Sequence, residues 1–243
     1  MANAALQMAV RLVYPPRCIS CGAMVEEDFG LCGPCWRDTP FITGLVCDLC
    51  GVPLPGEDDG TVVHCDACLA TARPWSQGRA AMRYEGNGRR LVLALKHGDR
   101  HDVAHPAGRW LARAAAPMRT DGMIIAPVPL HWTRFLARRF NQSALLAHAL
   151  ARETGMPVIP DLLLRPRRTQ SLNGLDHGAR HATLDAAIAV NPRHAKRIEG
   201  ARILLVDDVM TSGATFSAAT QTCLHGGAGD VCVLALARAA RAP

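Results

Sequence analysis

The sequence predicts an α/β protein in which a small cysteine-rich module precedes a doubly wound, mainly parallel sheet. Two observations predict this arrangement. From Gly78 onward, short apolar runs typical of strands alternate with helical patterns, and before Gly78 the chain carries eight cysteines in four C-x-x-C pairs. The 243 residues suffice for one sheet domain of ~150–180 residues and an appendage. We therefore expect a module over residues 1–75 and a sheet domain over residues 76–243.

The elements of the expected sheet domain follow one another in alternation. Runs typical of strands are Arg79–Tyr84, Met123–Ala126, Pro157–Pro160, Leu162–Leu164, Ala187–Val190, Ile203–Val206 and Asp230–Ala237. Helical patterns cover Arg89–Lys96, Val103–Ala115 with an early interruption at Pro106, Phe135–Glu153 with a bend near Asn141, and Phe216–Leu224. A short amphipathic helix over Ala4–Val13 is expected to pack on the cysteine module. Strands that alternate with helices favour parallel pairing.

The cysteine pairs predict structural metal sites. Cys18-Ile-Ser-Cys21-Gly22 and Cys47-Asp-Leu-Cys50-Gly51 have the form of zinc knuckles, in which the glycine permits a tight turn. Each is followed by a second pair, so the economical arrangement is two Cys₄ zinc sites in series, with the ligands Cys18, Cys21, Cys32, Cys35, Cys47, Cys50, Cys65 and Cys68. Interleaved pairing, disulfides and an iron–sulfur cluster are the alternatives. Four thiolates leave no position for a catalytic water, so the zinc is expected to be structural.

A second motif lies near the C-terminus. The apolar run Ile203–Val206 is typical of a strand buried on both faces, and Asp207 and Asp208 come at its end, where parallel sheets place ligand sites. A small hydroxyl-rich loop follows and leads into a helix, which together suit a phosphate; its residues are Thr211, Ser212, Gly213, Ala214 and Thr215. The acidic pair can accept hydrogen bonds from vicinal ribose hydroxyls. The motif therefore predicts a phosphorylated sugar as ligand.

This segment resembles the phosphoribosyl pyrophosphate (PRPP) signature of type I phosphoribosyltransferases. A receiver domain and a Walker B strand share its apolar run and acidic residues. However, a receiver domain carries its acidic pair near its start, and a Walker B strand needs a partner loop with a Gly-Lys dipeptide, which this sequence lacks. The hydroxyl-rich loop favours the phosphoribosyl interpretation.

Further motifs resemble the ComF family of competence proteins, which includes ComFC-like and GntX-like proteins. They are Pro127-Val-Pro-Leu130, Arg139-Phe-Asn-Gln142, Leu95-Lys-His-Gly98 and the double zinc ribbon. The resemblance covers nearly the whole chain and implies a type I phosphoribosyltransferase-like sheet domain behind a zinc-ribbon module. It implies that Asp207 and Asp208 contact the ribose as catalytic residues and that residues 211–215 bind the 5′-phosphate. The implied contacts to pyrophosphate are Pro127, Val128, Pro129, Leu130, Lys96, Arg138 and Arg139.

The polar segment 166–182 matches the family only partly. Relatives usually have Arg-x-x-Asn followed by Phe, whereas this chain has Arg180-His-Ala-Thr183 and Ile188. We expect this segment to close over bound PRPP, with Gln170 and Arg180 as its contacts. The departure leaves the acceptor unidentified.

Two functions from different classes follow. The first is a Mg²⁺-dependent enzyme that transfers phosphoribose to an unidentified acceptor, releases pyrophosphate and is linked to DNA uptake. The second is a PRPP- or nucleotide-responsive binding module that acts through the zinc ribbons on single-stranded DNA or a DNA-processing protein. The net charge of +6 suits anionic ligands of either kind, although the module has few aromatic residues for base stacking. No apolar stretch approaches ~20 residues, so we expect a cytoplasmic protein without a membrane partner.

Overall fold

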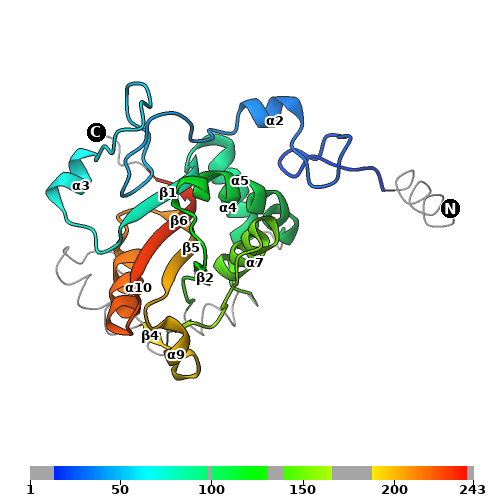
Figure 1. Ribbon diagram of the computed structural model, residues 1–243. Coiled ribbons are helices and arrows are strands. Elements are labelled where there is room, and N and C mark those ends of the chain that lie inside the picture. Colours follow the sequence, from blue (N-terminus) through cyan, green and yellow to red (C-terminus); the bar gives the residue numbers. More distant parts are fainter. Residues whose placement is uncertain (1–13, 98–99, 131–139, 166–187, 240–243) are drawn as a thin grey trace, which may run out of the picture.

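The computed structural model describes residues 14–97, 100–130, 140–165 and 188–239. Its centre is a four-stranded sheet in the order β1-β6-β5-β2, in which each adjacent pair is parallel (Figure 1). The strands are β1 (Gln77–Arg83), β2 (Ile124–Pro127), β5 (Arg202–Met210) and β6 (Asp230–Arg238). Two short strands, β3 (Leu163–Leu164) and β4 (Ala189–Val190), pair antiparallel as a separate sheet. The predicted parallel sheet is confirmed.

Helices cover both faces of the sheet, as expected for a doubly wound fold. On one face lie α4 (Gly86–His97), α5 (Ala104–Ala115) and α7 (Gln142–Thr154), and on the other lies α10 (Ala214–His225) (Figure 1). The remaining helices are short: α2 (Gly33–Arg37), α3 (Asp66–Ala70), α9 (Ala195–Ile198), and the 3₁₀ turns His101–Val103, Ala116–Met118 and Pro192–His194. In the described part of the chain, no helix has the length and apolarity needed to cross a membrane.

The packing of β5 explains why its run Ile203–Val206 is apolar at every position. Leu204 and Val206 pack in the core cluster that contains α4, α5 and α7, whereas Ile203 and Leu205 pack in the cluster that contains α10. All four are fully buried. A strand covered on both faces has no solvent side, so the hydrophobic alternation of a half-buried strand does not arise.

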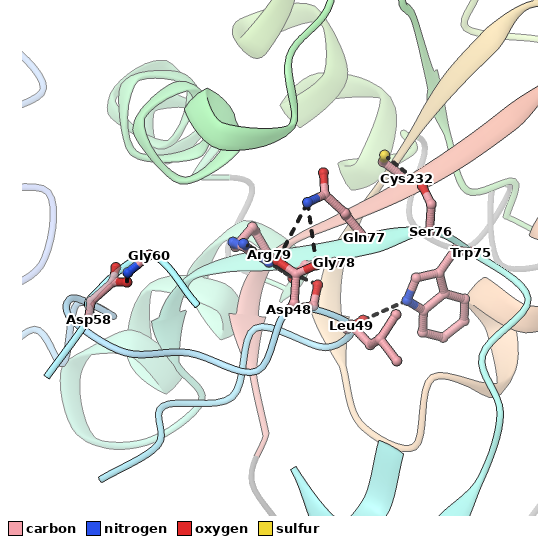
Figure 2. A network of polar contacts seen from close by, with 10 residues as sticks. All are labelled: Asp48, Leu49, Asp58, Gly60, Trp75, Ser76, Gln77, Gly78, Arg79 and Cys232. Carbon is pink, nitrogen blue, oxygen red and sulfur yellow. Dashed lines mark hydrogen bonds and ion pairs between the residues drawn. The ribbon is translucent and has the colours of Figure 1, made fainter. Parts of the chain in front are cut away.

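The second cysteine unit completes the face that α10 covers only in part. Cys47, Cys50 and Cys68 belong to the same buried cluster as Phe216 of α10, together with Trp75. The indole of Trp75 donates a hydrogen bond of 2.6 Å to the carbonyl of Leu49, between the two knuckle cysteines (Figure 2). The second unit is therefore part of the core of the sheet domain.

The strand that carries the acidic pair is longer than expected. The strand with the acidic pair continues to Met210, so Asp207 and Asp208 lie within β5. β6 pairs with β5 as far as Met210, whereas the ladder with β2 ends where Pro127 stands opposite Val206. The acidic pair therefore follows the last residue pair between β5 and β2.

The predicted helix over Phe135–Glu153, with a bend near Asn141, can be compared with the structure only from residue 140 onward, because residues 135–139 lie outside the described residues. α7 begins at Gln142, and Asn141 is its N-cap, with extended backbone and a side chain that accepts the Ser143 N–H. Pro106 does not interrupt α5, because it lies in the first turn, where its missing N–H costs nothing. Residues 4–13, where the N-terminal helix was expected, lie outside the described residues.

Candidate functional site

The eight cysteines of the C-x-x-C pairs form two separate clusters. Cys18, Cys21, Cys32 and Cys35 make up the first cluster, and Cys47, Cys50, Cys65 and Cys68 make up the second. Within each, the four sulfurs lie within 4.8 Å of one another, and none is bridged. The serial pairing is therefore confirmed, and the interleaved and disulfide alternatives are wrong.

The sulfur positions fit a tetrahedral metal. Zinc–sulfur bonds of ~2.3 Å place neighbouring sulfurs of a Cys₄ site ~3.8 Å apart. Cys21 and Cys32 have sulfurs 3.6 Å apart, and those of Cys50 and Cys65 are 3.7 Å apart. Burial raises the pKa of the Cys35 thiol to about 12. Metal binding displaces the proton of such a thiol, and four sulfurs at this spacing are the ligand set of a structural zinc, so each cluster is chemically a metal site.

The acidic pair of β5 lies in a polar network with two helices. The Lys96 ammonium of α4 is 3.0 Å from Asp208 Oδ1, and the Ser143 hydroxyl of α7 donates a 2.6 Å hydrogen bond to Asp207 Oδ1. Asp208 is 4% exposed, and its buried Oδ2 has no hydrogen-bond partner in the described part of the chain. A buried carboxylate oxygen without a partner is costly. The site therefore lacks a donor or cation that a ligand would supply.

The charge of the pair is only partly compensated. Burial and the neighbouring Asp208 charge together raise the pKa of Asp207 to about 7, against the lowering effects of the hydrogen bonds from Ser143 and the Asp208 N–H and of the Lys96 charge. One ammonium thus faces two carboxyl groups. Mg²⁺ favours sites with one or two carboxylates and phosphate oxygens, so the residues present fit Mg²⁺ arriving with a phosphorylated ligand.

These groups line a hollow of about 150 Å³ at the end of β2. It brings together Lys96, Val128, Pro129, Leu130, Gln142, Ser143, Arg165, Asp207, Asp208 and Thr215. Seven of the residues singled out from the sequence therefore converge here: Lys96, Val128, Pro129, Leu130, Asp207, Asp208 and Thr215. Pro127 ends β2 beside the hollow, and residues 211–214 form the turn between β5 and α10, with Gly213 in the left-handed conformation. Arg138, Arg139, Gln170 and Arg180 lie outside the described residues.

α7 opens with Gln142 and Ser143. Sequence reasoning missed Ser143 and named Gln142 only within the Arg139–Gln142 motif, without a role in the site. Gln142 is 4% exposed, and its Oε1 has no hydrogen-bond partner in the part of the chain that the structure describes. The signal was available, because Asn141 is a residue type that favours the N-cap. In a single helix through Asn141, residues 142 and 143 would lie in the helix interior. In the structure they form the first turn of α7, which faces the acidic pair.

Known proteins are similar to this chain at two levels: one similarity covers the N-terminal part, and the other covers most of the chain. A family model described as a double zinc ribbon domain matches residues 9–75. The DNA utilization protein YhgH of Shigella flexneri is 30% identical over 234 residues, covering 93% of this chain and 99% of the relative. Competence protein F of Haemophilus influenzae is 26% identical over 92% of this chain and 97% of the relative. Competence protein ComFC of Bacillus subtilis is 25% identical, with 84% and 82% covered.

Solved structures resemble part of the chain at low similarity. The glutamine PRPP amidotransferase of B. subtilis, complexed with ADP and GMP, is 17% identical with a TM-score of 0.42. That match covers 60% of this chain and 30% of the amidotransferase. The hypoxanthine-guanine phosphoribosyl transferase of L. donovani is 14% identical with a TM-score of 0.34, over 61% of this chain and 71% of that chain.

The two cysteine clusters should bind one zinc ion each. We expect Cys18→Ser and Cys47→Ser each to lose one of two zinc ions, because a Cys₄ site requires all four thiolates. Elemental analysis of the purified variants measures the loss, and Cys223→Ser, a buried cysteine of α10 in neither cluster, should keep both ions. Iron with inorganic sulfide, or protein without metal, would contradict the assignment.

The raised pKa of Asp207 predicts a pH dependence of stability. The folded carboxyl keeps a proton that the unfolded chain releases above ~pH 4, so without ligand Asp207 destabilises the fold as pH rises through about 7. Between pH 6 and 8, the free energy of unfolding of wild type should fall by about 1 kcal/mol relative to that of Asp207→Asn. Urea denaturation of both proteins in Mg²⁺-free buffer measures this difference. Parallel pH profiles would show that Asp207 is already ionised at pH 6.

Proposed function

Because this chain belongs to the ComF family, together with the DNA utilization protein YhgH and the competence protein ComFC, we propose that it is a PRPP-binding phosphoribosyltransferase. It would transfer phosphoribose to an unidentified acceptor and release pyrophosphate. The observation that carries this proposal is the unsatisfied Asp208 Oδ2, buried beside Lys96 in a hollow that Thr215 of the hydroxyl-rich loop also lines. The vicinal hydroxyls of a phosphorylated sugar would donate hydrogen bonds to the acidic pair. Its phosphate would accept hydrogen bonds from the hydroxyl-rich loop.

The arrangement of the elements suggests how PRPP would lie. Asp207 and Asp208 would accept hydrogen bonds from the ribose hydroxyls, while residues 211–215 and the first turn of α10 would hold the 5′-phosphate at a helix N-terminus. The pyrophosphate would lie toward Val128–Leu130, near the Lys96 ammonium. Arg138 and Arg139, from the adjoining segment outside the described residues, are proposed as further cations for it.

Catalysis in such a site rests on charge. When the anomeric C–O bond breaks, its electron pair leaves with pyrophosphate and positive charge develops on the ribose ring, while the acceptor forms the new bond to the anomeric carbon. Asp207 and Asp208 would hold the ring by its hydroxyls and stabilise its developing charge, and Lys96 would offset negative charge on the leaving group. Mg²⁺, when bound, would neutralise further charge on the pyrophosphate.

A second candidate function follows from an aromatic hollow away from the acidic pair. Trp36, Phe41, Trp110 and Arg113 are among the residues that line a hollow of about 490 Å³. The Trp36 and Phe41 rings are 4.7 Å apart, those of Phe41 and Trp110 are 5.3 Å apart, and Trp36 is 50% exposed. An exposed indole beside an arginine, backed by two further rings, suits the stacking of unpaired bases. A non-catalytic, PRPP-responsive module that binds single-stranded DNA, or a DNA-processing protein, is therefore the alternative.

The acidic pair should be essential for PRPP binding but not for folding. We expect the double variant Asp207→Asn, Asp208→Asn to lose measurable binding of Mg²⁺-PRPP in calorimetry, because both carboxylates would serve the ligand. Circular dichroism and zinc content should remain those of wild type. Asp161→Asn is the control, since Asp161 pairs with His194 beside the small sheet. Unchanged PRPP affinity in a folded double variant would refute the assignment.

Two assays on one preparation separate the enzyme from the binding module. The enzyme predicts pyrophosphate release that depends on an acceptor from a panel of bases and amines. The binding module predicts no such release, with affinity for single-stranded DNA that falls steeply with salt and drops about tenfold in Trp36→Ala. Turnover without DNA binding would retain the first function, and DNA binding without turnover would retain the second.

A further inference from the structure

Two arginines far apart in the sequence connect the hydroxyl-rich loop to the second cysteine cluster. Arg238, at the end of β6, is 7% exposed. One guanidinium nitrogen donates hydrogen bonds of 3.1 Å to the Met210 carbonyl and 2.8 Å to the Thr211 carbonyl. Another lies 3.7 Å from the sulfur of Cys50. A single buried side chain thus contacts both the start of the loop and a metal ligand.

Arg73 makes a second connection of the same kind. Its guanidinium donates a 2.9 Å hydrogen bond to the Ser212 carbonyl and lies close enough to the Cys68 thiol to lower its pKa, against the raising effect of burial. Trp75 lies beneath the cation, with its ring centre 5.5 Å from the guanidinium carbon. Gly213 is packed against both, because an added Cβ would lie 3.0 Å from the Trp75 ring and 3.3 Å from the Arg73 guanidinium. The loop therefore rests on residues that hold the second cluster.

These contacts determine which way the loop presents its amides. In a trans peptide the C=O and N–H bonds point in opposite directions. Arg238 holds the Thr211 carbonyl and Arg73 holds the Ser212 carbonyl, so the N–H groups of Ser212 and Gly213 are turned away from the cluster. Neighbouring N–H groups held in this way form an anion-binding nest. The arginines thereby preorganise the backbone that would meet a phosphate.

The metal of the second cluster in turn stabilises the positions of the two arginines. A divalent zinc with four thiolates carries a net charge of −2, which two guanidinium groups balance. Without the metal, the four sulfurs of the second cluster lose the bonds that hold them within 4.8 Å of one another, and the Cys50 sulfur that Arg238 contacts is no longer fixed. Loss of the metal should therefore displace the arginines and release the carbonyls that they hold.

We propose that Arg73 and Arg238 are positioning residues through which the metal of the second cluster maintains the 211–215 loop in its anion-binding conformation. This inference rests on the proposed function in naming PRPP as the ligand of the loop. The coupling itself is a property of the fold. Metal loss from the second cluster then lowers PRPP affinity without any change to a ligand-contacting residue.

Matched variants test the proposal. We expect Arg73→Met and Arg238→Met to weaken Mg²⁺-PRPP binding about tenfold each in calorimetry, since each removes charged hydrogen bonds to the loop. Arg79→Met is the control, because Arg79 attaches the same cysteine unit through a 2.5 Å ion pair with Asp48 (Figure 2) and, within the described residues, makes no hydrogen bond to the loop. We expect at most a twofold change in that variant. Equal losses in all three would reduce the effect to general destabilisation and overturn the proposal.

Hydrogen–deuterium exchange of the 209–216 peptide tests the coupling without ligand. Cys65→Ser should lose the second metal and speed exchange in this peptide severalfold, as should Arg73→Met, whereas Cys21→Ser should lose the first metal and leave it unchanged. Loop exchange that does not respond to Cys65→Ser or Arg73→Met would overturn the proposal even if PRPP binds. If wild type does not bind PRPP but the exchange follows the expected pattern, the coupling stands and the proposed function fails. Arg238→Lys replaces Arg238→Met if the latter does not fold.

Discussion

The burial of β5 on both faces is the constraint on which the rest of the molecule depends. Its apolar residues point alternately into two core clusters, so each side of the strand must be covered. Three helices cover one side, but α10 alone does not complete the other. The second cysteine unit fills that side with Cys47, Cys50 and Trp75. A module that is too small to build its own core thus becomes part of a larger one.

The polar end of the same strand follows from where its neighbours stop. β2 ends at Pro127, while β6 continues to pair with β5 beyond the acidic residues. The space beyond β2 is lined by the start of α7 and by Lys96 of α4, which together leave Asp208 only partly satisfied. A buried carboxylate oxygen without a partner destabilises the fold. Destabilising groups of this kind are typical of ligand-binding sites.

The two cysteine units occupy different places in the structure, although their sequences are alike. The first lies beside α4, where Asn87 hydrogen-bonds the Cys35 carbonyl and Ile19 joins the core on that face. The second lies beneath the loop between β5 and α10. Equivalent metal ligands therefore serve different neighbours: one unit supports a helix that carries Lys96, and the other supports the loop proposed to bind phosphate (Figure 1).

The sequence by itself determined the local features: the apolar strands, the serial Cys₄ pairs, and the acidic pair followed by a hydroxyl-rich loop. These depend on residues close in the chain, whose spacing reports periodicity and ligand geometry directly. Only the tertiary structure decided what lies against them. Ser143 meets Asp207 across 64 positions, Arg73 meets Ser212 across 139, and Arg238 meets Cys50 across 188. No local pattern encodes such pairs, because strand order and helix packing bring them together after each segment has its own structure.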